Sequence, residues 1–175
     1  NNVGTTPESA PFKDVRVRQA VNYAINRKGF ADSLVRGGSQ PVYAPCFRTQ
    51  YGCETGKVVK YDYNPAKAKA LLQEAGFDAS KPLKFELLYN TDDNHKKVAV
   101  AVASMWKKLG VQVSLVNQEW KTYLETKKQG NFDVGRAGWI ADYNEASSML
   151  DLMQTTHGNN DGKYSNPVFD KLMTE

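Results

Sequence analysis

Strand and helix patterns alternate between residues 83 and 137, and this alternation constrains the fold more than any other feature of the chain. Apolar residues recur at every second position in 83–89, 111–115 and 132–137, and the segments between them carry apolar residues at helical spacing. Parallel strands are joined by crossovers of this kind, which are right-handed. We therefore predict an α/β fold with a mixed, mostly parallel sheet and flanking helices.

Helix caps indicate where the other elements begin. Asp14 precedes an apolar stripe that predicts a helix, and a second short helix is predicted around Phe30. Asn64 and Asn166 each stand before a Pro, which is typical of a cap followed by the first helical position. One more helix is predicted to begin at 144–145. Residues 1–13 are predicted to be a flexible lead-in and 38–63 a long loop, which its tyrosines anchor.

Length and composition are consistent with one domain. The 175 residues suffice for a single core, and no apolar run approaches the roughly 20 residues needed to cross a bilayer. The first residues lack the basic head and apolar segment of a signal peptide. The last helical pattern is still open at Glu175, so we expect the sequence to be part of a longer protein. The net charge of +4 is dispersed, which argues against nucleic-acid binding.

The two cysteines have three interpretations. Cys46 and Cys53 lie seven positions apart in a segment rich in turn-forming residues. We favour a disulfide that closes a small loop, provided that the protein lives in an oxidising compartment. Two free thiols are the plain alternative. A metal site is the least favoured, because His95 and His157 lie far away in the sequence.

No recognised catalytic constellation is present. The motifs of serine hydrolases, phosphate-binding loops, zinc metalloproteases and dinucleotide-binding domains are absent. Asp133 and Asp142 are both acidic, but nothing in their spacing places them side by side. We therefore predict that the chain is not an enzyme and has no catalytic residue, metal or cofactor. The aromatic and charged residues of 117–145 are interpreted as a recognition surface.

The segment after the strand at 132–137 holds the main binding candidates. Ligands of open α/β sheets lie beyond the carboxyl ends of the strands, where Gly138, Trp139 and Ile140 are found. Gly138 has no side chain, so an extended peptide could approach and pair with this segment. Asp142 is suited to bind a ligand ammonium, but capping of the following helix is an equally good interpretation.

Four further residues have both a structural and a functional interpretation. Arg136 lies on the strand, where it would meet either a carboxylate of its own chain or that of a ligand. His95 follows a strand, but a lone surface histidine is usually inert. Trp120 and Trp139 are types more often found in a core, although two Trp beside two strand ends favour a pocket wall.

Four segments are similar to one protein family. They are PFKDVRVRQAVNYAINR (11–27), AKALLQEAGFDASKPL (68–83), LLYNTDDNHKKVAVAVASMWKKLGV (87–111) and NQEWKTYLETKKQGNFDVGRAGWIADYNE (117–145). Together they resemble the C-terminal lobe of the periplasmic oligopeptide-binding proteins of ABC importers, solute-binding protein family 5. The resemblance runs from Pro11 onward, and the DVRVRQA and GWxADYNE patterns carry it. Ile140 departs from the family, which often has a cysteine there.

This resemblance implies a fold, a function and a location. The fold would be one lobe of a type II periplasmic-binding protein, with residues 1–175 forming a truncated C-terminal lobe of a larger two-lobed protein. That protein would close over an oligopeptide and deliver it to an inner-membrane ABC permease. It would be periplasmic, or extracytoplasmic and membrane-associated if it carries a lipid anchor. We expect a monomer that binds no nucleic acid.

The resemblance also implies roles for individual residues. The peptide's α-ammonium would be bound by Asp142, and its backbone by Gly138 and Ile140. The terminal carboxylates of peptides of different length would lie toward Arg136, His95 and Lys127. The side-chain pockets would be lined by Trp120, Leu124 and Trp139. Alternative functions are a specialised receptor for murein peptides, dipeptides or a metal complex, and a chaperone-like domain that binds peptide segments.

Overall fold

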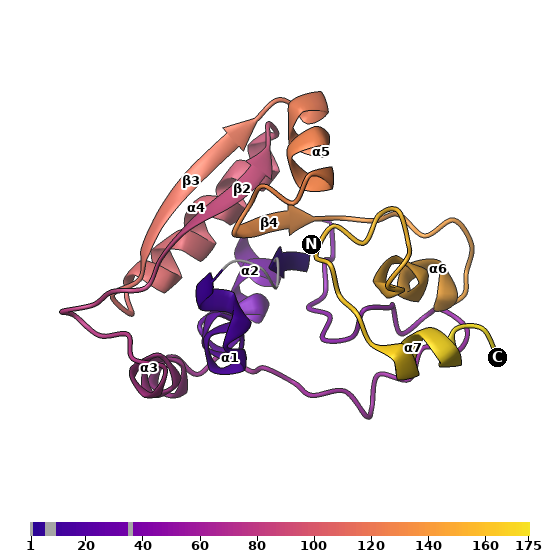
Figure 1. Ribbon diagram of the computed structural model, residues 1–175, viewed down its shortest axis with the longest axis horizontal. Helices are drawn as coiled ribbons and strands as arrows, with labels where there is room; N and C mark the ends of the chain where they lie inside the picture. The colour runs from indigo at the N-terminus through magenta and orange to yellow at the C-terminus, as the bar shows by residue number, and fades with distance from the viewer. Residues whose placement is uncertain (1, 6–9, 35–36) are drawn as a thin grey trace.

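A four-stranded sheet organises the computed structural model, which describes residues 2–5, 10–34 and 37–175. Its strands are β1 (Asn2–Thr5), β2 (Lys84–Asn90), β3 (Gln112–Gln118) and β4 (Val134–Ala137), in the order β1-β4-β2-β3 (Figure 1). Strand β2 is parallel to both β3 and β4, whereas β1 is antiparallel to β4. The prediction of a mixed, mostly parallel sheet is confirmed.

Strand β1 was not predicted. It lies within residues 1–13, which the sequence suggested to be a flexible lead-in, and it pairs with β4 from Asn2 opposite Ala137 to Thr5 opposite Val134. A 3₁₀ helix, η1 (Ala10–Lys13), follows in the same stretch. The described part of the lead-in is therefore part of the fold. Its backbone hydrogen bonds to β4 hold it in place, although its polar composition does not predict a strand.

In the described part of the chain, eight helical segments follow η1. They are α1 (Val15–Tyr23), α2 (Arg27–Ser33), α3 (Pro65–Glu74), α4 (Asp93–Lys107), α5 (Trp120–Lys128), α6 (Ser147–Leu150), η2 (Asp151–Met153) and α7 (Pro167–Leu172). The predicted caps are present: the side chains of Asp14, Asn64 and Asn166 accept hydrogen bonds from backbone N–H groups of the first turns. The helix predicted from 144–145 begins later, at Ser147, and gives way to the 3₁₀ helix η2 at Asp151.

The core lies between the sheet and the helices. Helix α4 runs along β2 and β3, and α1 and α3 pack side by side (Figure 1). Trp106 of α4 is buried with Phe85 of β2 and Phe12, whose rings meet edge to face. The Trp106 indole Nε1 donates to the Val21 carbonyl at 3.0 Å, which ties α4 to α1 while satisfying a buried polar group.

The predicted long loop contains no helix or strand beyond an isolated bridge at Tyr51. Its tyrosines anchor it as expected. Tyr61 packs its ring on Tyr23 of α1, with 5.1 Å between centroids, and its carbonyl accepts from Arg27 of α2 at 3.0 Å. Tyr43 donates to Asp62 within the loop. None of the helices in the described ranges is both long and apolar enough to cross a membrane.

Candidate functional site

Polar side chains gather where β2 and β4 end. Arg136 of β4 extends its guanidinium to β2, where Nη1 donates to the side-chain oxygen of Asn90 at 3.2 Å. Asn90 is the last residue of β2 and is buried. Because the two strands are parallel, their carboxyl ends lie at the same edge of the sheet. Helix α4, which carries His95, begins just after β2 at this edge. The roles that the resemblance implies for Arg136 and His95 toward a ligand carboxylate stay predictions.

His95 stands in the first turn of α4, within electrostatic range of the Arg136 guanidinium. Asp92 caps this helix by accepting from the backbone N–H groups of Asn94 and His95, both at 2.9 Å. Its carboxylate Oδ1 lies 3.7 Å from His95 Nδ1. Burial lowers the pKa of His95, the nearby Arg136 charge lowers it further, and Asp92 opposes both. His95 is thus held toward the neutral form, beside a permanent cation.

Gly138 gives the Arg136 guanidinium its space. A Cβ at position 138 would lie 2.6 Å from Arg136 Nη2 and 3.2 Å from Cζ. The sequence suggested that the missing side chain admits a ligand backbone. The structure shows a use inside the chain as well, since the guanidinium itself occupies the room that a side chain would need.

Helix α5 is fastened to the same strand. The Tyr123 hydroxyl donates to the Arg136 carbonyl, and the Tyr123 side chain is fully buried. The ring of Trp120 stacks on Tyr123 with 5.7 Å between centroids. Trp120 is nevertheless 50% exposed, and Leu124 on the same helix is also exposed. Neither belongs to the core, and their predicted place on a pocket wall stays a prediction.

Trp139 and Ile140 are exposed too, and Ile140 is 91% exposed. For the backbone of 138–141, the described residues supply no hydrogen-bond partner outside regular elements. Single exposed apolar side chains are common on protein surfaces, so the exposure shows only that this segment is open to solvent.

Asp142 follows that segment, and its carboxylate is exposed. Its backbone N–H donates to Ser148 Oγ at 2.8 Å. Among the described residues, no ion pair or hydrogen bond of the Asp142 carboxylate is found. The alternative that Asp142 caps the next helix is wrong, because the N-cap of α6 is Ala146 and no side chain caps it.

Lys127 has a partner within the chain. Its Nζ lies 2.9 Å from Asp161 Oδ2, with the two side chains 13% and 23% exposed, and 5.4 Å from the centre of the Tyr123 ring. This ion pair was not predicted. The predicted role of Lys127 toward a ligand carboxylate would therefore require exchange of Asp161 for the ligand.

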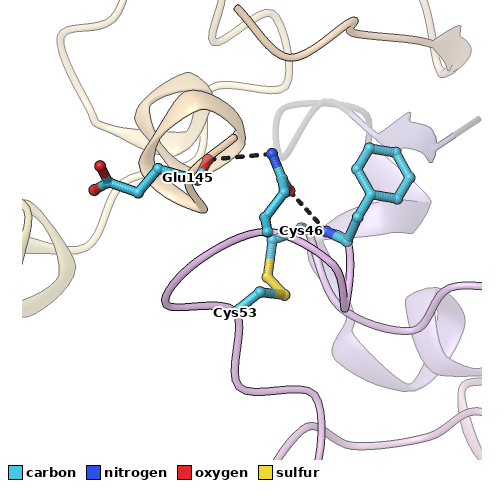
Figure 2. Close-up of a disulfide and its surroundings, with 5 residues drawn as sticks. Cys46, Cys53 and Glu145 are labelled. Atoms are coloured by element: carbon cyan, nitrogen blue, oxygen red, sulfur yellow. Dashed lines mark hydrogen bonds between the residues drawn. A yellow bond between two sulfur atoms is a disulfide. The ribbon is translucent and has the colours of Figure 1, made fainter. Parts of the chain in front are cut away.

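The structure joins Cys46 and Cys53 in a disulfide, the first of the three interpretations of the sequence (Figure 2). Within the described ranges, no three His, Cys, Asp or Glu side chains are grouped to hold a metal. Asn90 and Ser148 are site residues that sequence reasoning missed. A signal existed for Asn90, since a polar residue that ends a buried strand at an inward position needs a partner.

Comparison with known proteins gives these features a context. Residues 2–161 match the family described as "Bacterial extracellular solute-binding proteins, family 5 Middle". The chain is 49% identical over 173 residues to the periplasmic oligopeptide-binding protein OppA of Salmonella typhimurium and 43% identical to the periplasmic murein peptide-binding protein MppA of Escherichia coli. Each alignment covers 96% of this chain and 32% of the relative. The chain thus spans about a third of the length of these relatives.

Solved structures agree. The Haemophilus influenzae OppA complex with the peptide RPPGFSPFR superimposes with a TM-score of 0.87 at 40% identity, covering 98% of this chain and 35% of that one. The unliganded open form of the murein tripeptide-binding protein MppA gives a TM-score of 0.90 at 42% identity, covering 98% and 34%. Both the fold and the sequence therefore place the chain within one group of binding proteins.

Proposed function

The chain belongs to family 5 of the bacterial extracellular solute-binding proteins, and from this membership we propose that it is one lobe of a periplasmic receptor for oligopeptides. The receptor has two lobes, binds the backbone and termini of an extended peptide, and delivers it as a monomer to an ABC permease of the inner membrane. It catalyses no reaction, in keeping with a family of solute-binding proteins.

One observation carries the proposal: two opposite charges flank one short, open segment. Arg136 and Asp142 are six positions apart, so their Cα atoms are at most about 20 Å apart. An extended peptide of up to about six residues, at about 3.3–3.6 Å per residue, has its ammonium and carboxylate within that distance. The Asp142 carboxylate is exposed, and Arg136 lies beside His95 at the other end. A short zwitterionic chain is the ligand that this arrangement suits.

The segment between the charges supports backbone recognition. Residues 138–141 have backbone groups that the described chain leaves open, and such groups pair readily with an added strand. Recognition through backbone and termini is independent of peptide sequence. The exposed side chains of Trp120, Leu124 and Trp139 would then contact the peptide side chains without selecting among them closely.

A receptor for murein peptides is the second candidate. The resemblance to MppA supports it, since identity and TM-score are close to those for the OppA proteins. The two functions share the Asp142 and Arg136 roles and differ in the peptide that they prefer. Competition between a free tripeptide and a murein tripeptide for the complete protein distinguishes them, because the preferred ligand displaces the other at lower concentration.

Calorimetry on the complete protein that contains this chain tests the proposal. Tripeptides with a free or an acetylated amino terminus are titrated into the parent protein and into its Asp142→Asn variant. We expect the variant to lose about 2–5 kcal/mol of affinity for the free peptide, because the ammonium loses its charged partner in a closed site. Glu145→Gln, which removes a nearby exposed carboxylate, is the matched control. Equal affinities of parent and Asp142→Asn for the free peptide would reject the proposal, and binding that ignores acetylation would favour a chaperone-like domain.

A further inference from the structure

The disulfide-closed loop, residues 46–53, contacts the segment that carries Asp142. The loop belongs to the long irregular stretch between α2 and α3, about ninety positions before Asp142 in the sequence. Figure 2 shows Glu145 opposite this loop, with a hydrogen bond between them. Two segments that are far apart in the chain are therefore in direct contact at this place.

Gln50, at the centre of the loop, uses both polar atoms of its side-chain amide, one within the loop and one across the contact. Its Oε1 accepts from the Phe47 backbone N–H at 2.8 Å, which fixes the side chain within the loop. Its Nε2 donates to the Glu145 carbonyl at 3.1 Å, and this bond joins the loop to the segment that follows Asp142. Gln50 is only 6% exposed, so replacement of either bond by water is unfavourable.

Tyr51 adds two backbone bonds to the same segment. Its N–H donates to the Asn144 carbonyl at 3.3 Å, and its carbonyl accepts from the Ala146 N–H at 2.9 Å. These bonds form a short parallel bridge between Tyr51 and Glu145. Beneath it, the buried side chains of Cys46 and Ala146 belong to one small apolar cluster, against which Cys53 also packs.

The contact continues to the backbone of Asp142. Ser148 follows the bridged residues, is buried, and donates its backbone N–H to the Glu145 carbonyl at 3.2 Å. Its hydroxyl oxygen accepts from the Asp142 N–H at 2.8 Å. Hydrogen bonds thus connect the loop, through Glu145 and Ser148, to the Asp142 backbone, while the Asp142 side chain is exposed.

We propose that the disulfide-closed loop 46–53 is a positioning element for Asp142, with Gln50 as its contact residue. This inference rests on the proposed role of Asp142 toward a peptide ammonium. The loop contains no regular secondary structure, so without a covalent closure it would sample many conformations. The disulfide restricts them to those that present Gln50 and Tyr51 to residues 144–146. Selectivity for a free amino terminus then depends in part on the Cys46–Cys53 bond.

Two variants of the complete protein test the proposal. Gln50→Glu keeps the acceptor for the Phe47 N–H and loses the donor for the Glu145 carbonyl, and the paired change Cys46→Ser with Cys53→Ser opens the loop. The measured quantity is the ratio of affinities for a tripeptide with a free and with an acetylated amino terminus. We expect the ratio to fall about fivefold in Gln50→Glu, as for the loss of one hydrogen bond, and further in the paired variant. Gln40→Glu, on an exposed glutamine before the loop, is the control.

Two further measurements distinguish loss of Asp142 positioning from a general loss of peptide binding. The ratio of affinities for free and amidated carboxyl termini should stay at the parent value, because Arg136 and His95 lie on other elements. Adding Gln50→Glu to Asp142→Asn should cause no additional change in the amino-terminal ratio. An unchanged amino-terminal ratio in Gln50→Glu, or an equal loss for free and acetylated peptides, overturns the inference, even if the paired cysteine variant fails to fold. If Asp142→Asn alone leaves the ratio unchanged, the proposed function itself fails, and this inference fails with it.

Discussion

The guanidinium of Arg136 lies against the Cα of Gly138, so closely that a Cβ at position 138 would come within 2.6 Å of Nη2. We predict that Gly138→Ala displaces the guanidinium and breaks its hydrogen bond to Asn90. Affinity of the complete protein for a free peptide carboxylate, measured relative to the amidated peptide, should fall about tenfold, since hydrogen bonds to charged groups contribute about 1.5–3 kcal/mol.

Gly56→Ala is the control for that experiment. Nothing lies within 4 Å of a Cβ at position 56, so the new methyl group meets open space. The control should bind both peptides as the parent does. Retention of the full preference for a free carboxylate in Gly138→Ala would show that the guanidinium can move aside without consequence.

Arg136→Gln should raise the pKa of His95. Burial and then the Arg136 charge hold this pKa below its ordinary value, and the substitution removes the second cause. The chain has only two histidines, so the ring signals in an NMR titration are readily assigned by comparison with a His157→Gln variant. A His95 titration that is unaltered by Arg136→Gln would contradict the electrostatic contact.

The same depressed pKa makes stability depend on pH. Because folded His95 takes up its proton at lower pH than the unfolded chain does, the unfolded state binds more protons in the interval between the two pKa values. The free energy of unfolding should therefore fall as the pH is lowered from neutrality through about 6.5, the ordinary value for histidine. Urea unfolding at a series of pH values should show that the free energy of unfolding of His95→Gln falls less steeply with decreasing pH than that of the parent. An identical dependence on pH in the two proteins would contradict the assignment to His95.

Asp161→Asn should destabilise the fold by leaving Lys127 without its partner. Both side chains are largely buried, so their 2.9 Å ion pair is screened less than one on an open surface. We expect a coupling energy of about 1 kcal/mol or more from a double-mutant cycle with Lys127→Met, measured by urea unfolding. A coupling near zero would mean that Lys127 is free to exchange Asp161 for a ligand carboxylate.

Tyr123→Phe should cost about 1–2 kcal/mol of stability. The substitution removes the hydroxyl that donates to the Arg136 carbonyl and leaves that carbonyl without this donor. Tyr63→Phe is the control, because Tyr63 is exposed and no hydrogen bond of its hydroxyl is found among the described residues. If both variants unfold at the same urea concentration, the hydroxyl of Tyr123 contributes nothing to holding α5 on β4.

The elements that the sequence predicted best are those whose local signals agree with one another. Helix α4 has a capping Asp92, a continuous apolar stripe and a glycine just after its end, and strands β2 and β3 alternate regularly. Each of these signals lies within the element itself. Because all of them pointed to the same alternation, the sheet type and the crossovers could be derived before any coordinates were known.

Strand β1 and the shortness of α6 could not be derived in this way. The four residues of β1 are too few to show a period, and their partner β4 lies more than a hundred positions away. Helix α6 begins only at Ser147 because residues 144–146 are bonded to Tyr51 of the disulfide loop. In both cases, contacts that are distant in sequence override the local preference.

The candidate site was predictable in its residue types and not in its pairings. The position of Arg136 on a strand suggested a contact with a carboxylate, and the structure gives it the amide of Asn90 as a partner. Lys127 was expected to face a ligand and is paired with Asp161. The reason is the same for both: spacing along one element indicates a face, whereas the partner across that face is set by how separate elements pack.

The pairing of β1 with β4 also has a mechanical consequence. Val3 stands opposite Arg136 in an antiparallel ladder that spans the whole of β4. Tension on any polypeptide that precedes Asn2 would act along this ladder in shear and reach β4 directly. If Arg136 holds a ligand as proposed, its guanidinium would be sensitive to force arriving through the neighbouring strand, with no helix needed to transmit the load.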